Sequence, residues 1–124
     1  MEIQNDKDDL TLKDLNQFTG TEQYHRIGLF SQTNLTDGVI YVMKNGYSWF
    51  ITDMLSVVYC EPKIKEQEFL CFKLKIDLEK KTARATITDG DDNILYKQDY
   101  EYANAQIELN LFLTNGVLLL DNEY

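Results

Sequence analysis

The chain has 124 residues and a formal net charge of −9, from 21 acidic and 12 basic residues. This length is typical of a single domain with one core, and a content of 44% hydrophobic and 12% aromatic residues excludes intrinsic disorder. No apolar run approaches the roughly 18–20 residues of a membrane span. The first residues lack the basic and apolar regions of a signal peptide, so we expect a cytoplasmic protein. Cys60 and Cys71 are then expected to be reduced thiols.

The part of the chain before Pro62 is predicted to be largely helical, over about residues 8–60. Apolar residues in "DDLTLKDLNQF" recur near helical spacing. "TDGVIYVMKNG" begins with Thr36 and Asp37, which cap helices, and ends with Asn45-Gly46, a stop signal. "SWFITDMLSVVYC" has a narrow polar stripe at three- and four-residue spacing, which favours a mostly buried helix over a strand. Two or three helices follow from these patterns.

After Pro62 the apolar period changes from helical spacing to two, which predicts strands over about residues 68–120. The alternating segments are "EFLCFKLKIDL", "ARATIT", "ILYKQDYEY" and "IELNLFL", followed by the short strand "VLLL". "EKKT" and "DGDDN" are predicted turns, and Asn115-Gly116 is a strong hairpin signal. Connections this short favour antiparallel neighbours. The predicted fold is therefore α+β, with the helices on one face of an antiparallel meander of about five strands.

Charge is unevenly distributed along the chain. Residues 61–84 have a balance of +2, whereas residues 89–124 carry eight acidic residues and one basic residue, Lys97, a balance of −7. An acidic surface repels nucleic-acid phosphates and anionic membranes, and it attracts basic proteins. The alternative interpretation is that the charge serves solubility alone. The expected partner is a basic protein such as a nucleic-acid-binding effector, and neither direct nucleic-acid binding nor membrane binding is expected.

In a sequential meander the outer face would run from basic strands to acidic strands. Carboxylates there would take the place of phosphates, with tyrosines as anchors. The predicted partner-binding residues are Asp91, Asp92, Asp99, Tyr100, Glu101, Tyr102 and Glu108. The alternative is nucleic-acid binding through the basic segment, residues 63–84. Its cations are Lys63, Lys65, Lys73, Lys75, Lys80, Lys81 and Arg84.

The stretch "FTGTEQYHRIG", residues 18–28, concentrates polar side chains of several kinds. Glu22 and Arg26 share a face whether the segment is helix or strand, so an ion pair is expected. We interpret the segment as a structural network that joins the helical part to the sheet. A small-ligand site or an active site is the alternative. The members of the predicted network are Thr21, Glu22, Tyr24, His25 and Arg26.

No catalytic, cofactor-binding or metal-binding residue is assigned. His25 is the one histidine, and no nucleophile motif accompanies it. The "DGDDN" stretch has the early spacing of a calcium loop. However, Ile94 stands where such a loop needs Gly and Tyr100 where it needs Glu, so a hairpin turn is predicted instead.

Five segments give the chain a resemblance to known proteins: "FTGTEQYHR", "TDGV", "NGYSWF", "LYKQDYEY" and "NGVLLLDNEY". With these, about residues 15–124 resemble a family of short, uncharacterised bacterial and phage-borne proteins that form a domain of unknown function. The resemblance implies a small, soluble, intracellular protein often encoded on mobile DNA, and it implies no functional residue. His25 departs from the aromatic residue expected in relatives. If the chain is phage-encoded, it would act in the host cytosol, and it would be a candidate inhibitor of a host defence protein, comparable to an anti-CRISPR protein.

Overall fold

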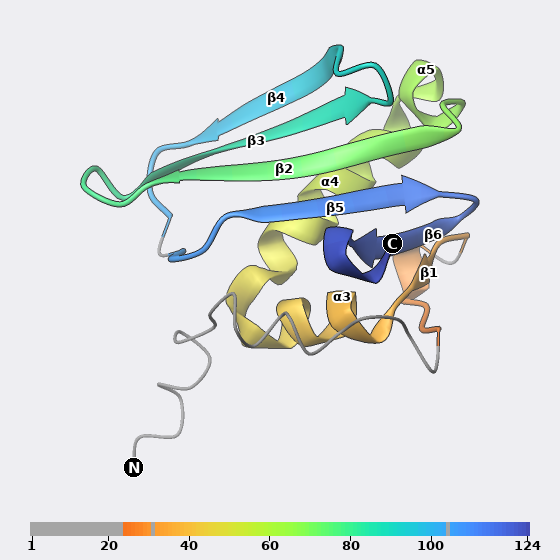
Figure 1. Ribbon diagram of the computed structural model, residues 1–124, viewed down its shortest axis with the longest axis horizontal. Coiled ribbons are helices and arrows are strands. Elements are labelled where there is room, and N and C mark those ends of the chain that lie inside the picture. Colours follow the sequence, from red (N-terminus) through yellow and green to blue (C-terminus); the bar gives the residue numbers. More distant parts are fainter. Residues whose placement is uncertain (1–23, 31, 104) are drawn as a thin grey trace.

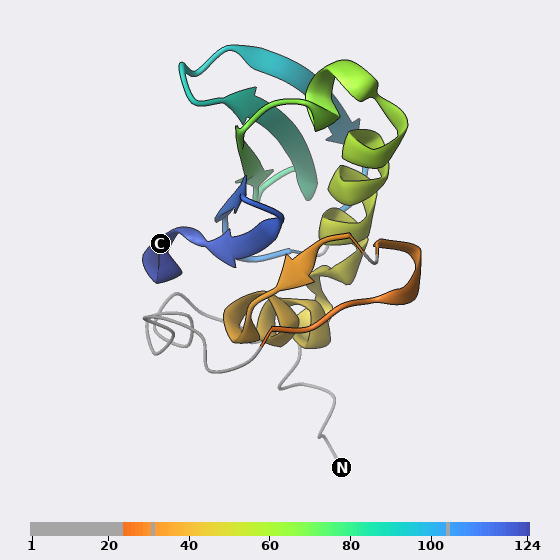
Figure 2. The ribbon, with the colours of Figure 1, turned by 90° about the vertical axis from the view of Figure 1, so that its right-hand side faces the viewer.

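The computed structural model describes residues 24–30, 32–103 and 105–124. Figure 1 shows a twisted sheet with helices against one of its faces, and the two layers are seen side-on in Figure 2. The α+β class is therefore confirmed. The helix predicted around residues 10–18, and Thr21 and Glu22 of the predicted polar network, lie outside the described residues.

The helical layer is one continuous stretch made of two helical segments that meet at a kink. Helix α3 (Asp37–Val42) continues through a π-helical turn (Met43–Tyr47) into α4 (Ser48–Cys60). The kink lies at Asn45 and Gly46, where Gly46 has a φ of 101° that favours glycine. The predicted stop signal lies at this kink, where the backbone of Asn45 and Gly46 leaves helical geometry. A short helix, α5 (Pro62–Lys65), follows with Pro62 in its first turn, so helical structure extends past the proline.

The sheet has six strands in the order β1-β6-β5-β2-β3-β4. Strands β2 (Phe69–Asp77), β3 (Thr82–Asp89) and β4 (Ile94–Tyr100) form the predicted antiparallel meander. Strand β5 (Leu109–Thr114) then pairs with β2 instead of β4, and β6 (Val117–Leu120) pairs with β5. Strand β1 (Asn34–Leu35) lies parallel to β6. The prediction of five strands in a purely antiparallel meander was therefore wrong.

The position of β5 has a physical reason in the pattern of its side chains. Pairing with β2 sets three leucines of β5 opposite three apolar residues of β2, which builds a continuous apolar face. The opposed pairs are Leu109 with Leu74, Leu111 with Phe72, and Leu113 with Leu70. Strand β4 offers glutamine and tyrosine on that face, so pairing β5 with β4 would bury polar groups against leucine.

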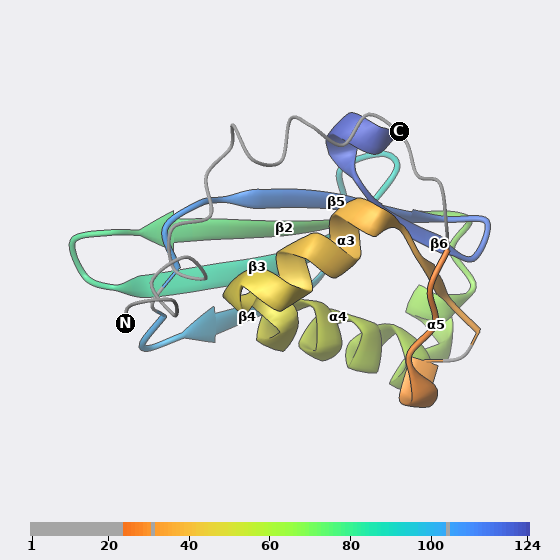
Figure 3. The ribbon, with the colours of Figure 1, turned by 90° about the horizontal axis from the view of Figure 1, so that it is seen from below.

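The core lies between this apolar face and α4, which crosses beneath the sheet in Figure 3. Phe50, Ile51 and Met54 of α4 are fully buried, as are Phe72 and Leu111 of the sheet. Burying each of these side chains stabilises the fold by roughly 1.5–3 kcal/mol relative to exposure. No helix in the described part of the chain is long and apolar enough to cross a membrane.

Two local predictions for the sheet are confirmed. Ala83, Ala85 and Ile87 of β3 are buried, as the alternating pattern indicated. Asn115 and Gly116 form the tight turn between β5 and β6, with φ values of 53° and 74°. Positive φ at both central residues is the mark of the type I′ hairpin turn that this dipeptide favours.

Candidate functional site

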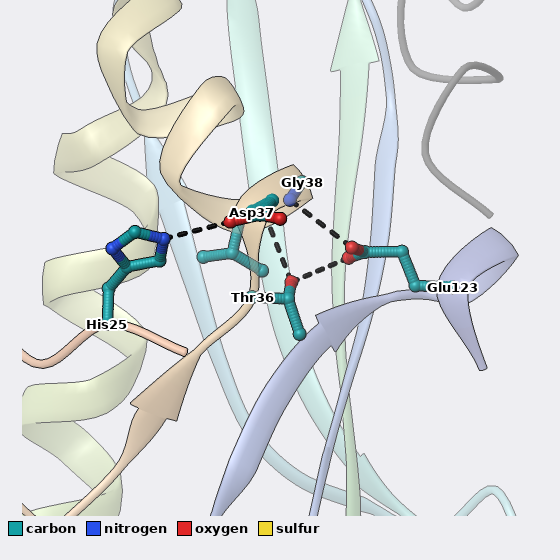
Figure 4. Close-up of polar contacts among 6 residues, drawn as sticks. His25, Thr36, Asp37, Gly38 and Glu123 are labelled. Carbon is teal, nitrogen blue, oxygen red and sulfur yellow. Dashed lines mark hydrogen bonds and ion pairs between the residues drawn. The ribbon is translucent and has the colours of Figure 1, made fainter. Parts of the chain in front are cut away.

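A polar network joins the end of the chain to the start of α3 (Figure 4). The Glu123 carboxylate accepts hydrogen bonds from the Thr36 hydroxyl at 2.6 Å, the Gly38 backbone N–H at 3.2 Å and the Leu120 backbone N–H at 2.9 Å. The Thr36 hydroxyl accepts a bond from the Val39 N–H at 3.3 Å. We call Thr36, Gly38 and Glu123 the α3 cap. It satisfies backbone donors that a helix start leaves without partners.

The predicted polar segment adds His25 to this region. His25 Nε2 lies 2.9 Å from Asp37 Oδ1, and its backbone exchanges hydrogen bonds of 2.7 and 2.6 Å with Leu35. Arg26 donates to the Asn34 side chain at 2.8 Å, and Tyr24 is 60% exposed. These contacts connect the segment to β1 and α3, as a structural network would.

The α3 cap has a structural role, because its hydrogen bonds stabilise the start of α3. The Thr36 hydroxyl donates to the Glu123 carboxylate and accepts from the Val39 N–H, so it links that carboxylate to the first turn of α3. Among the described residues, no group of three or more His, Cys, Asp and Glu side chains could hold a metal ion.

The structure divides the predicted partner-binding residues between two ends of the sheet. Asp91 and Asp92 lie in the turn between β3 and β4. The others lie toward the opposite end, where β4 finishes and β5 begins. They do not form one continuous acidic strip.

Two of these carboxylates are already paired within the chain. Arg84 donates to Asp99 at 2.6 and 3.2 Å, and this contact holds the pKa of Asp99 below its ordinary value. Glu108 lies 3.7 Å from the Lys75 ammonium and accepts the Ile76 N–H at 3.1 Å. The predicted gradient from basic to acidic strands is therefore largely neutralised by ion pairs.

Tyr100 packs the sheet onto the helix. Its hydroxyl donates to Asp53 of α4 at 2.8 Å, and its ring meets the Trp49 ring edge-on at 4.8 Å between centroids. Burial, followed by the hydrogen bond to Asp53, raises the pKa of Tyr100. Neighbouring Tyr102 is 70% exposed, and Glu101 is also exposed.

The cations of the basic segment are dispersed. Lys75 and Arg84 are in ion pairs, and Lys65 lies 5.0 Å from the centre of the Tyr59 ring. Lys80 and Lys81 lie at the opposite end of β2 from α5. A nucleic-acid backbone would therefore meet no single strip of free cations along this segment.

Four carboxylates line a shallow groove of about 540 Å³. It lies between the segment that leads from α5 into β2 and the turn that follows β3. We call it the acidic groove, and its lining includes Glu66, Glu68, Phe69, Asp89 and Asp91. Among the described residues, Glu66, Glu68 and Asp91 take part in no ion pair. Their charges are therefore open to an outside partner.

Asp89 shapes one wall of the acidic groove. Its carboxylate accepts hydrogen bonds from the Asp91 N–H at 2.8 Å and from the Asn93 N–H and side-chain amide at 3.0 and 3.1 Å. Hydrogen bonds to the charged form favour it, so the pKa of Asp89 is lowered and the group stays ionised at neutral pH. Glu66 and Glu68 were absent from the sequence prediction. Sequence reasoning could have found them. The antiparallel hairpin of β2 and β3 sets Leu70 opposite Asp89, so the residues just before β2 lie beside the turn after β3.

An aromatic cluster adjoins the acidic groove on the sheet face opposite the helices. Phe69, Phe112 and Tyr124 pack with ring centroids 5.1, 5.2 and 6.1 Å apart. Tyr124 is 74% exposed, and Phe69 also lines the groove. Through Phe69, the carboxylates of the groove adjoin a cluster of two partly exposed rings and one exposed ring.

A family model described as "Family of unknown function (DUF6876)" matches residues 9–124. The resemblance to a domain of unknown function is confirmed at that level. No curated protein and no solved structure matches the chain.

Proposed function

Because the chain belongs to this family of unknown function, DUF6876, we propose its role from the surface itself: a non-enzymatic module that binds a basic protein. The observation that carries the proposal is the acidic groove, where Glu66, Glu68 and Asp91 gather and form no ion pair with any cation of residues 24–30, 32–103 or 105–124. Gathering like charges is unfavourable within the chain. A partner with Lys or Arg side chains would relieve that repulsion and be steered toward the groove.

The aromatic cluster gives such a complex an anchor. Tyr and Phe contribute large apolar area at protein interfaces, and Tyr also keeps a polar end for hydrogen bonding. Phe69 belongs to both the groove and the cluster, so one partner surface can contact both. Electrostatic attraction would bring the partner to the groove, and contacts with Tyr124 and Phe69 would stabilise the complex.

The finer proposal concerns the kind of basic partner. The carboxylates would stand in for phosphates on a protein that otherwise binds nucleic acid. The resemblance to phage-borne proteins supports a mobile-element inhibitor that occupies the nucleic-acid groove of a host defence protein, such as a CRISPR nuclease, in the host cytosol. Asp92 follows Asp91 in the same turn, whereas Asp99 and Glu108 would have to exchange their present partners Arg84 and Lys75.

The test is affinity capture from a lysate of the native host, with washes of rising salt and identification by mass spectrometry. The bait is the full chain, beside a variant Glu68→Lys/Asp91→Lys that reverses two groove charges. The matched control, Glu79→Lys/Glu101→Lys, makes the same charge change at the opposite end of the sheet. We expect a basic nucleic-acid-binding protein that the groove variant fails to retain and the control retains.

Two results would count against the proposal. One is a partner that both variants retain equally at every salt concentration. The other is capture of acidic or neutral proteins alone. A partner lost with the control but kept with the groove variant would place binding at the Glu101 end instead.

A further inference from the structure

The two edge strands of the sheet, β1 and β4, differ in whether backbone groups on their outer side are paired. At one edge β1 is covered, because His25 bridges to Leu35 with two backbone hydrogen bonds. At the other edge β4 pairs with β3 alone among the described residues. Figure 1 shows β4 along the outer margin of the sheet. Each of its seven residues is at least partly exposed, unlike those of the central strands.

An edge of this length presents backbone N–H and C=O groups that can pair with another strand. On one side of β4 lies a largely apolar groove of about 700 Å³ between the strand and helices α4 and α5. Its apolar lining comes from Val57, Ile64, Leu95 and Tyr96. A strand added to β4 would therefore gain apolar cover on its helix side as well as backbone hydrogen bonds.

We propose that β4 pairs antiparallel with β4 of a second copy of the chain, around a two-fold axis at Gln98. In this register Lys97 of each copy lies opposite Asp99 of the other, which gives two ion pairs across the interface. On the helix side, Tyr96 of each copy lies opposite Tyr100 of the other. The strand is thus complementary to itself in both charge and aromatic content.

The charges of β4 favour the register with the axis at Gln98 over the adjacent registers, with the axis at Lys97 or at Asp99. Residues opposite each other in an antiparallel pair must lie on the same face, so the axis can pass through a residue but not between two. An axis at Lys97 would set two lysines directly opposite each other, and an axis at Asp99 would set two aspartates opposite each other; both arrangements are destabilising. With the axis at Gln98, Asp99 lies between Arg84 of its own β3, at 2.6 Å, and Lys97 of the second copy.

The residues that pair in this interface lie along β4 and none of them lines the acidic groove, although the apolar groove beside β4 shares Glu66 and Gln67 with it. The two proposals therefore succeed or fail separately. The expected assembly is a dimer with one continuous sheet running through both copies.

Sedimentation velocity of the full chain, up to about 100 µM, tests the proposal. We expect a dimer. Lys97→Asp places carboxylates opposite one another, and Asp99→Lys places ammonium groups opposite one another. Each variant alone should dimerise at least about tenfold more weakly. Mixed together, they should form a heterodimer, because both cross-strand contacts then join opposite charges. Lys44→Asp is the matched control and should dimerise like the wild type.

Circular dichroism establishes that each variant is folded. A monomeric wild type at the highest concentration overturns the proposal, and so does a dimer that Lys97→Asp leaves intact. Failure of the two folded variants to associate when mixed would overturn the register.

Discussion

Replacement of Gly38 by alanine tests the α3 cap most sharply. In an ordinary helix this substitution stabilises by roughly 0.5–1 kcal/mol, because alanine loses less conformational entropy on folding than glycine. Here a Cβ on residue 38 would lie 2.7 Å from Glu123 Oε1 and 2.7 Å from Leu120 Cδ1. The side chains of Glu123 and Leu120 must therefore shift away from residue 38.

The magnitude follows from the hydrogen bonds that Glu123 makes. If the side chain is displaced, its bonds from Thr36, Gly38 and Leu120 are lost or weakened. Hydrogen bonds to a charged group contribute roughly 1.5–3 kcal/mol each, and partial exposure and local relaxation reduce the loss. After subtraction of the normal alanine gain, we expect Gly38→Ala to lower the free energy of unfolding by about 2–4 kcal/mol.

The assay is urea unfolding of four proteins: wild type, Gly38→Ala, Glu123→Ala and the double variant. Glu123→Ala removes one of the two obstructing side chains and the hydrogen bonds that its displacement would break, so Gly38→Ala should cost at least about 1 kcal/mol less in that background. Unchanged m-values would show that the difference lies in stability. If Gly38→Ala instead stabilises the protein, or the two effects simply add, the contact between Gly38 and Glu123 does not hold the fold as described.

Three further predictions concern other parts of the fold. Tyr100→Phe should lower the free energy of unfolding by about 1 kcal/mol at neutral pH. Because the pKa of Tyr100 is raised by burial and Asp53, this deficit should shrink as the pH rises above the ordinary tyrosine value of about 10, as urea unfolding at both pH values will show. A thiol reagent should label exposed Cys60 in the native protein. It should label Cys71, whose pKa burial raises, only on unfolding, as peptide mass spectrometry can establish. Gly116→Val should lower the urea midpoint through a loss of roughly 1–2 kcal/mol, since φ is +74° there; an unchanged midpoint would contradict that turn geometry.

The sequence predicted most of what depends on local periodicity. The alternation in β2 and β3 located most of their buried residues, although Cys71 and Thr88 are buried against the pattern. Asn115-Gly116 located the last hairpin, because period-two patterning and positive φ are set by neighbouring residues. The long-range arrangement was missed. Nothing local indicates that β5 crosses to β2, and the two residues of β1 are too few to show a period.

The candidate site shows the same division. Asp91 was identified from charge alone, whereas Glu66 and Glu68 needed the register of β2 against β3. The pairing of Arg84 with Asp99 also follows from an antiparallel register, here of β3 against β4. The contact between Gly38 and Glu123 joins residues 85 positions apart, so no local sequence pattern indicates it.

The central claim is that the acidic groove binds a basic partner, and an equilibrium titration with the captured protein tests it most directly. Wild type, Glu68→Lys/Asp91→Lys and Glu79→Lys/Glu101→Lys would be compared at one fixed, moderate salt concentration. The account predicts that the groove variant binds at least about tenfold more weakly, while the control stays within about twofold of the wild type. Equal affinities for the wild type and the groove variant would contradict it.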